Sequence, residues 1–149
     1  MILPDFKAFP HNGRLLGVDW GQRRIGLAVS DINHDFVFVR PGVVLSRGAD
    51  NHANLVADFA KKESVVGIVV GLPLHADGSD SNTTKQVRNF IDTLSEITDL
   101  PICTIEENLT SVVAQENMGR VSVSEIKENL DSESARVILE NAIAMIKRA

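Results

Sequence analysis

A short apolar run between two segments of helical periodicity constrains the fold of this chain most. Residues 65–70 are mostly β-branched, which is typical of a strand buried on both faces of a parallel sheet. Residues 51–62 before the run have helical periodicity, and Asp50 is their predicted N-cap. A polar, turn-rich loop over 71–82 leads into a second helical pattern over 80–98. The sequence therefore predicts a helix–strand–helix unit that belongs to a parallel sheet.

The first part of the chain has a different pattern. Residues 14–19 and 25–30 are apolar segments joined by a tight connection at 21–24, which predicts an antiparallel hairpin. A third strand is predicted over 42–45, after Pro41. Three antiparallel strands followed by alternating helices and strands indicate an α/β fold, a mixed β-sheet with helices on both faces. The remaining predicted elements are a strand over 102–105, a helix over 110–118 and a last helix over 132–148.

Length, charge and cysteine count limit the class of protein. The 149 residues fit one domain, and we expect residues 1–12 to be an N-terminal extension and 13–149 to be a single domain. The lone cysteine excludes an internal disulfide framework, and no apolar run is long enough for a membrane helix, so we expect a cytoplasmic protein without a membrane partner. The net charge of −5 excludes a global basic field, so a polyanion must be held by a local patch or by metal ions.

Acidic residues stand at three unusual places. Asp19 ends the first predicted strand, and Glu106 and Glu107 end the last one. Asp131 immediately precedes the last predicted helix and continues its apolar face. Each acid also has an ordinary interpretation, as a turn residue, a solvated strand end or an N-cap, and spacing alone does not choose between Glu106 and Glu107. If three of them converge, they form an oxygen-rich site suited to Mg²⁺ or Mn²⁺, and such ions in pairs promote phosphodiester hydrolysis.

Four blocks of the sequence resemble those of one family in the same order. They are GVDWGQRRIGLAVSD at 17–31, VVGLPL at 69–74, EENLTS at 106–111 and LDSESARVIL at 130–139. Together they resemble the YqgF family, whose members are described as Holliday junction resolvases and as nucleases that mature the 5′ end of pre-16S ribosomal RNA. The match covers nearly the whole chain after residue 13.

The resemblance implies a ribonuclease H-like fold and a carboxylate triad. Carried over by position, the triad is Asp19, Glu107 and Asp131, which would hold two Mg²⁺ or Mn²⁺ ions and so selects Glu107 over Glu106. We therefore expect a metal-dependent nuclease that acts in 5′-end maturation of pre-16S ribosomal RNA, with RNA preferred over branched DNA. The expected partners are nucleic acid and a pre-ribosomal particle, and the expected state is a monomer or weak homodimer.

Three further residues bear on substrate binding. Arg23 and Arg24, close after Asp19, are candidate phosphate contacts, although solvated hairpin charges are an equally good interpretation of either one. Asn108 stands where the family has an arginine, and an asparagine cannot make the bidentate phosphate contact of an arginine. This departure keeps two alternatives open: a Holliday junction resolvase acting on branched DNA, or a non-catalytic RNA-binding ribosome-assembly factor.

A third alternative comes from the first block itself. Gly17 to Gly21 also resembles the first phosphate loop of the actin-like and sugar-kinase ATPases. Those proteins need two lobes and a second, glycine-rich segment that binds adenosine. The chain is too short for two lobes, so this alternative is disfavoured.

Overall fold

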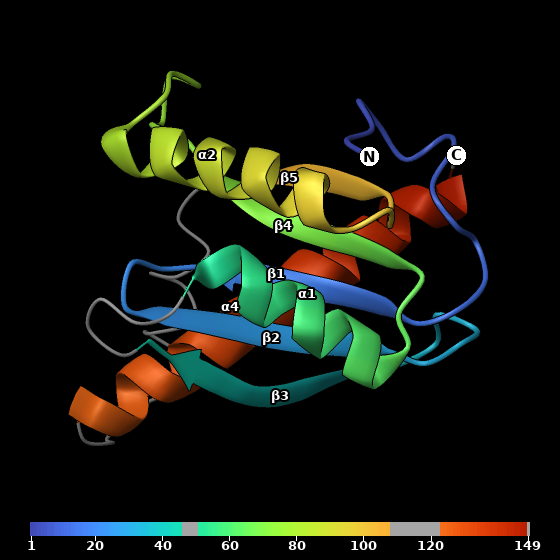
Figure 1. The fold of residues 1–149 in the computed structure, drawn as a ribbon, viewed down its shortest axis with the longest axis horizontal. Coiled ribbons are helices and arrows are strands. Elements are labelled where there is room, and N and C mark those ends of the chain that lie inside the picture. The colour runs from blue at the N-terminus through green and yellow to red at the C-terminus, as the bar shows by residue number, and fades with distance from the viewer. Residues whose placement is uncertain (46–50, 108–122, 149) are drawn as a thin grey trace.

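Eight helices and strands are described in the structure, a computed structural model that covers residues 1–45, 51–107 and 123–148, with only the backbone of 123–132. The elements and their sequence order are visible in Figure 1. They are β1 (Leu15–Trp20), β2 (Arg24–Ser30), β3 (Val37–Val44), α1 (His52–Glu63), β4 (Gly67–Pro73), α2 (Asn82–Ile97), β5 (Ile102–Glu107) and α4 (Val123–Arg148).

The five strands form one mixed sheet in the order β3-β2-β1-β4-β5. β1 pairs with β2, and β2 with β3, in antiparallel fashion. β4 runs parallel to both of its neighbours, β1 and β5. This topology confirms the predicted combination of an opening antiparallel meander with a parallel second half.

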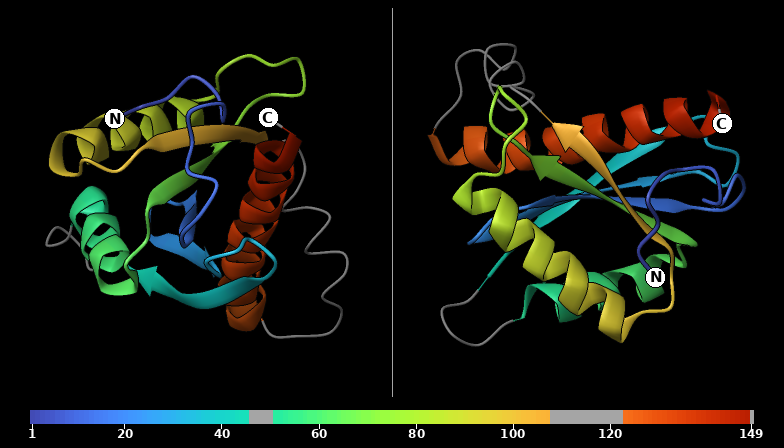
Figure 2. Two further views of the ribbon diagram at one scale, coloured as in Figure 1. Left: turned by 90° about the vertical axis from the view of Figure 1, so that its right-hand side faces the viewer. Right: turned by 90° about the horizontal axis from the view of Figure 1, so that it is seen from above.

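The molecule has three layers, which Figure 2 shows end-on. α1 and α2 pack side by side on one face of the sheet, and α4 crosses the other face. α4 contacts all five strands, and β1, β2 and β3 most closely. Helices therefore cover both faces, as predicted.

Each face of the sheet has its own apolar core. Along β1, Leu16 and Val18 belong to the core under α1 and α2, whereas Leu15 belongs to the core under α4. Gly17 lies on the α4 side, where a Cβ would come within 2.8 Å of Leu139 Cβ. The absence of a side chain at position 17 thus allows α4 to approach the centre of the sheet closely.

The lone cysteine, Cys103, is part of the α4-side core and is only 1% exposed. Burial raises the pKa of its thiol to about 11. In β5 it packs as a small core residue.

Two strands differ most from the bounds that the sequence predicts. β3 begins at Val37 rather than at residue 42 and includes Pro41, which was expected to precede the strand. β3 is an edge strand, and an edge strand accommodates proline because one side of it needs no ladder hydrogen bond. β4 runs from Gly67 to Pro73, so it begins two residues later and ends three residues later than the predicted strand over 65–70. The loop that follows therefore also begins later.

Two helix starts also differ from the prediction. α1 is capped by Asn51, whose side chain accepts hydrogen bonds from the backbone N–H groups of Ala53 and Asn54, and not by Asp50. α4 begins at Val123, so residue 131 lies inside the helix and is not its N-cap. The segment before residue 131 contains strong helix formers, so the helix continues through Asp131 and Ser132, although this pair resembles an N-cap signal. The helix predicted over 110–118 lies outside the described residues.

The first nine residues pack against the sheet and the α4-side core. The backbone N–H of Ile102 donates to the carbonyl of Met1, and that of Leu3 donates to the carbonyl of Ile102, beside β5. Phe6 and Phe9 are buried and meet edge to face, with ring centroids 5.4 Å apart. Among the described helices, none combines the length and the apolar character needed to cross a bilayer.

Candidate active site

The carboxyl ends of β1, β4 and β5 meet at one edge of the sheet. Asp19 is the fifth residue of β1 and alternates with Gly17, so it lies on the α4 side of the sheet. It pairs with Gly26 across the hairpin. On its other side, the register that joins Val18 to Val70 places Asp19 next to Gly71 of β4.

Glu107 reaches the same place from the opposite side. It is the last residue of β5 and pairs with Pro73 of β4. A Cβ on Gly71 would lie 2.6 Å from Glu107 Oε1 and 2.4 Å from Ile138 Cδ1 of α4. The Glu107 carboxyl group therefore lies over Gly71, between the sheet and α4, in the space that a larger residue at position 71 would fill.

Glu106 and Glu107 lie on opposite faces of the sheet, as strand alternation requires. Glu106 is exposed, whereas Glu107 is half-buried on the α4 side. Spacing alone left the choice between them open. The structure brings Glu107, and not Glu106, to the face on which Asp19 lies.

Burial raises the pKa of Glu107 to about 7. The cause is desolvation, which disfavours the charged form of a carboxyl group. A nearby cation would have the opposite effect, because it favours the ionised form. At neutral pH the Glu107 carboxyl group is therefore about half ionised, and a cation beside it would favour its charged form.

The third predicted acid, Asp131, lies in α4 one helical turn before Ala135. Ala135 in turn lies over Gly17, since its carbonyl oxygen would be 2.9 Å from a Cβ there. Figure 1 shows the N-terminal half of α4 at the same end of the sheet as the carboxyl ends of β1 and β4. The backbone thus carries position 131 toward the edge where Asp19 and Glu107 lie.

The side chain of Asp131 and all of Asn108 lie outside the described part of the chain. Within the side chains that are described, no three His, Cys, Asp or Glu residues form a group able to hold a metal ion. The described pair of acids supplies two of the three predicted ligands.

Arg23 and Arg24 lie in and directly after the turn that follows Asp19. Arg23 is exposed and Arg24 is half-buried at the start of β2. Neither side chain forms an ion pair within residues 1–45, 51–107 and 133–148. Two other arginines behave differently, because Arg14 and Arg40 both bind Glu63, at 3.1 and 2.9 Å.

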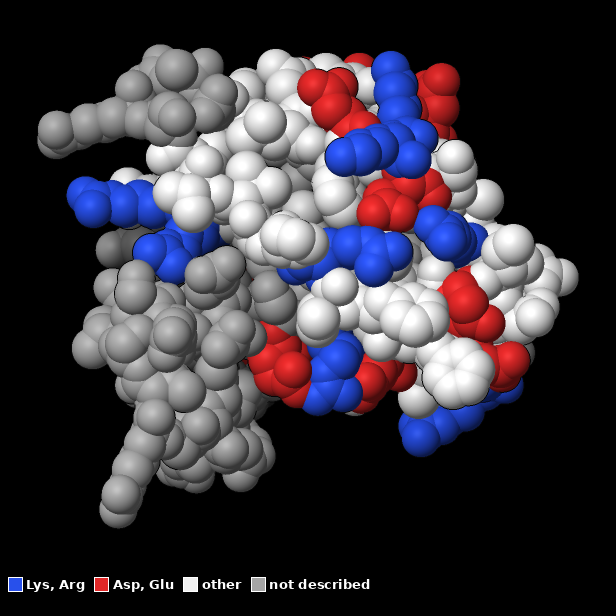
Figure 3. Space-filling model, turned by 90° about the horizontal axis from the view of Figure 1, so that it is seen from below, with Lys and Arg blue, Asp and Glu red and all other residues white. Residues whose placement is uncertain are grey.

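The charge distribution around the β3 edge is mixed. Figure 3, which views this side of the molecule, shows Lys and Arg side chains next to Asp and Glu side chains. Paired charges of this kind leave little net field for a polyanion. Arg23 and Arg24, which lack such partners among the described residues, therefore remain the candidates for phosphate contacts.

Gly71 is the site feature that sequence reasoning missed. The sequence pattern predicts a loop from residue 71, whereas Gly71 lies inside β4, beneath the Glu107 carboxyl group. A glycine that follows a β-branched run is a recognisable signal, since glycine within a strand often marks a close approach by another group. That signal identifies the position but not the group that approaches it.

Comparisons with known proteins agree with this architecture. The model of the RuvX family, described as Holliday junction resolvase, matches residues 13–145. A protein of Maridesulfovibrio salexigens named "putative pre-16S rRNA nuclease" is 39% identical over 134 residues, which cover 88% of this chain and 98% of that protein. A protein of the same name from Sphingopyxis alaskensis is 37% identical over 148 residues, which cover 97% and 96%.

Among solved structures, Thermus thermophilus RuvC in complex with a Holliday junction substrate is similar in fold, with a TM-score of 0.55. The two chains share 10% sequence identity, and the match covers 91% of this chain and 96% of RuvC. This likeness confirms the predicted ribonuclease H-like fold. With the family model and the relatives above, it follows that the chain belongs to the RuvX (YqgF) family, as its four sequence blocks predicted.

Proposed function

We propose that this protein is a metal-dependent nuclease that hydrolyses phosphodiester bonds in the 5′-end maturation of pre-16S ribosomal RNA. The observation that carries the proposal is the meeting of Asp19 and Glu107 on one face at the carboxyl ends of neighbouring strands. Ligands bind at this edge in open α/β sheets. The family membership and the names of the relatives support the reaction class and the substrate.

Mg²⁺ or Mn²⁺ is the metal that the donor set fits. Asp19, Glu107 and Asp131 offer only carboxylate oxygens, which such hard cations prefer. The buried carboxyl group of Glu107 gains from a neighbouring positive charge, because ionisation is otherwise costly there. When bound, a pair of such ions activates water and stabilises the leaving oxygen of a phosphodiester.

The protein's own residues have distinct tasks in this proposal. Asp19 and Glu107 would hold the ions, and Asp131 would complete the set of three carboxylates. Arg23 and Arg24 orient the phosphate backbone of the substrate next to Asp19. The net charge of −5 makes these local contacts and the ions necessary for binding a polyanion.

RNA is our preferred substrate because the relatives are named for a ribosomal RNA precursor. A pre-ribosomal particle in the cytoplasm is then the setting in which the protein acts, as a monomer or weak homodimer. The family description favours a second candidate, the cleavage of four-way DNA junctions. A resolvase of that kind needs two sites related by a two-fold axis, and hence a stable dimer.

Cleavage assays distinguish these functions. The purified protein is incubated with Mg²⁺ or Mn²⁺ and either a labelled RNA that spans the 5′ end of a 16S precursor or a labelled four-way DNA junction. We expect the RNA to be cut and the Asp19→Asn variant to be inactive. Cutting of the junction alone would replace the RNA assignment by the resolvase. RNA binding without cleavage under every metal condition would instead support a non-catalytic assembly factor.

A further inference from the structure

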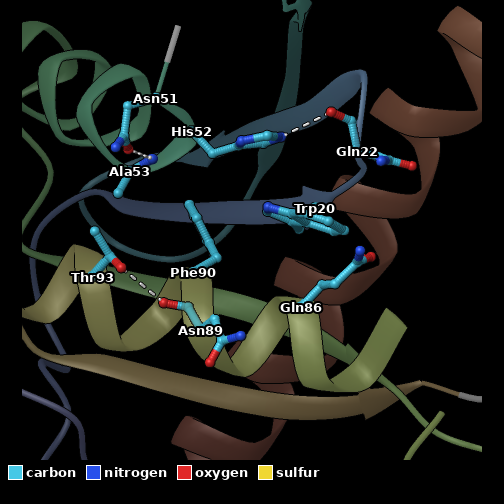
Figure 4. A pocket seen from close by; sticks show the side chains of 9 residues that line it. All are labelled: Trp20, Gln22, Asn51, His52, Ala53, Gln86, Asn89, Phe90 and Thr93. Atoms are coloured by element: carbon cyan, nitrogen blue, oxygen red, sulfur yellow. Dashed lines mark hydrogen bonds between the residues drawn. The ribbon is translucent and has the colours of Figure 1, made fainter. Parts of the chain in front are cut away.

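A cavity of about 370 Å³ lies between α1 and α2, on the face of the sheet opposite to Asp19. Figure 4 shows that its walls come from three places: the end of β1 with Trp20, the start of α1 with His52, and the face of α2 with Phe90. Its volume falls within the range of small-molecule sites in proteins. The carboxylate site does not use any of its residues.

Aromatic rings form the inner part of this cavity. Trp20 and His52 are stacked, with ring centroids 5.1 Å apart and an interplanar angle of 29°. His52 Nε2 lies 3.0 Å from the carbonyl oxygens of both Gly21 and Gln22. Both partners are acceptors, so Nε2 carries the proton, and these bonds fix the imidazole ring against the indole. Phe90 adds a buried ring from α2.

Neutral amide side chains form the rim. Gln22, Gln86 and Asn89 line the cavity, and their carboxamides make no hydrogen bond with any residue that the structure describes. Each offers N–H donors and a carbonyl acceptor. Among the described residues that line the cavity, none is Asp, Glu, Lys or Arg, which disfavours a charged ligand.

Trp20 contributes a further polar group. Its indole Nε1 is buried and has no hydrogen-bond partner within the described residues. A buried donor without a partner costs about 1–3 kcal/mol, and such groups are few in native proteins. A bound acceptor that paired with this N–H, after a small rotation of the indole, would remove that cost.

We propose that this cavity binds an unpaired nucleobase. A base is flat, so it fits against aromatic rings, and its uncharged edge carries both donors and acceptors. Asn and Gln carboxamides form paired hydrogen bonds with such edges, those of adenine in particular. The stacked rings and free amides, with no acidic or basic side chain in the described part of the lining, match a base better than they match a phosphate, a metal ion or an ionic metabolite.

The position of the cavity connects it to the candidate active site. Trp20 directly follows Asp19 in β1, and the two side chains belong to opposite faces of the sheet at the same strand end. A nucleic-acid strand that passes this edge can place one phosphate at the acids and a nearby base in the cavity. Only the assignment of the base to a substrate strand rests on the proposed nuclease function; the affinity of the cavity for a base does not.

The single tryptophan of the chain provides the test, because all indole fluorescence comes from Trp20. The protein is titrated without metal with adenosine and with a short single-stranded oligoadenylate, while fluorescence anisotropy of a dye on the oligonucleotide reports its binding independently. We expect saturable quenching of Trp20. Quenching by adenosine identifies a site for free nucleosides as well, and quenching by the oligonucleotide alone identifies a subsite for a strand; both support a base in the cavity.

Two variants of exposed amides make the test specific. The double variant Gln86→Leu, Asn89→Leu removes the α2 part of the rim. Its affinity for the probe, measured by the quenching titration, is expected to be about tenfold weaker, the effect of one paired amide–base contact. The matched control Asn54→Leu changes an exposed amide of α1 outside the cavity and leaves the affinity unchanged.

The proposal is overturned if neither probe quenches Trp20 fluorescence, or if the double variant binds the probe with the affinity of the wild type. A protein that quenches normally but fails to cleave RNA would contradict the proposed nuclease and leave the base site in place. The outcomes for the two proposals are therefore separate.

Discussion

The two faces of the sheet differ in how closely the helices pack against the strands. They also differ in the kind of side chain that lies between helix and sheet at the strand ends. On the α4 side, glycines at 17 and 71 stand where a Cβ would collide with α4 or with Glu107, and two carboxyl groups lie at the strand ends. On the other side, α1 and α2 pack over a larger aliphatic core and leave a neutral, aromatic cavity beside Trp20. Adjacent residues of one strand, Asp19 and Trp20, thus enter environments of opposite character.

This contrast shows how a sheet separates two kinds of chemistry by alternation alone. The acids are near one another because parallel strands end together, whereas the cavity lies where the end of β1, the start of α1 and one face of α2 meet. If the contrast is functional, changes on the α4 side affect the reaction and changes on the α1/α2 side affect only binding.

The largest effect is expected for Asp19→Asn. The substitution keeps the shape of the side chain but removes its charge, so metal-dependent cleavage should fall by about a thousandfold or more, since bound metal ions contribute several kcal/mol to such reactions. The measurement is the rate of RNA cleavage in Mn²⁺. The control Asp92→Asn changes an exposed acid of α2 and should leave the rate unchanged. Near-normal cleavage by the Asp19 variant would remove the α4 side from the mechanism.

The second effect concerns the pH dependence of stability. Burial raises the pKa of Glu107 from 4.5 to about 7, so the folded protein keeps a proton that the unfolded chain releases. This contribution to stability is complete below about pH 4.5 and is lost as the pH rises through 7, by up to about 3 kcal/mol.

Denaturant unfolding at pH 5 and pH 7.5, with a chelator present, measures this loss. Glu107→Gln cannot titrate and should lose less stability than the wild type between the two pH values. Added Mg²⁺ or Mn²⁺ should restore stability to the wild type at pH 7.5 and not to the variant. Identical pH profiles for the two proteins would show that Glu107 is not desolvated in the folded state.

A third, smaller effect compares the two glycines of the α4 side. Gly71→Ala places a methyl group against Ile138 and Glu107, and Gly17→Ala places one against Leu139 and Ala135. Each should lower the free energy of unfolding by about 1–3 kcal/mol, as overpacking does. Gly71→Ala should in addition alter the Glu107-dependent pH profile described above, because it displaces that carboxyl group. Equal pH profiles for both variants would contradict the placement of Glu107 over Gly71.

The smallest effect is expected for the two arginines of the hairpin that joins β1 to β2. Arg23→Ala and Arg24→Ala should each weaken RNA binding a few-fold and reduce the slope of log K against log salt by about 1, which is the signature of one lost phosphate contact. Titrations at several salt concentrations measure the slope. Arg136→Ala is the control, because Arg136 is engaged by Glu133 and Glu140 on α4. An unchanged slope for either hairpin variant would assign that arginine to the solvated surface.

Local patterns predicted most of the fold. Two apolar segments joined by a tight connection located the hairpin of β1 and β2, and helical periodicity located α1 and α2. The errors came where a local signal competes with a tertiary one. Pro41 suggested a strand boundary, but an edge position tolerates it, and the Asp–Ser pair at 131–132 resembled a cap, but the helix continues through it.

The site was predictable only in part for a related reason. Strand alternation places Glu106 and Glu107 on opposite faces, but it does not say which face α4 covers. Likewise, the stacking of Trp20 on His52, which comes from a distant helix, has no local signal in the sequence. Packing between elements far apart in the chain decides both questions.

The buried thiol of β5 has a practical consequence for following these events in solution. A thiol reacts as its thiolate, and at neutral pH Cys103 is both shielded and protonated. Dyes or spin labels directed at a new cysteine on the exposed side of α2 will therefore attach there alone, with no need to replace the natural one. The wild-type background is therefore suitable for following the binding of a ligand next to α2.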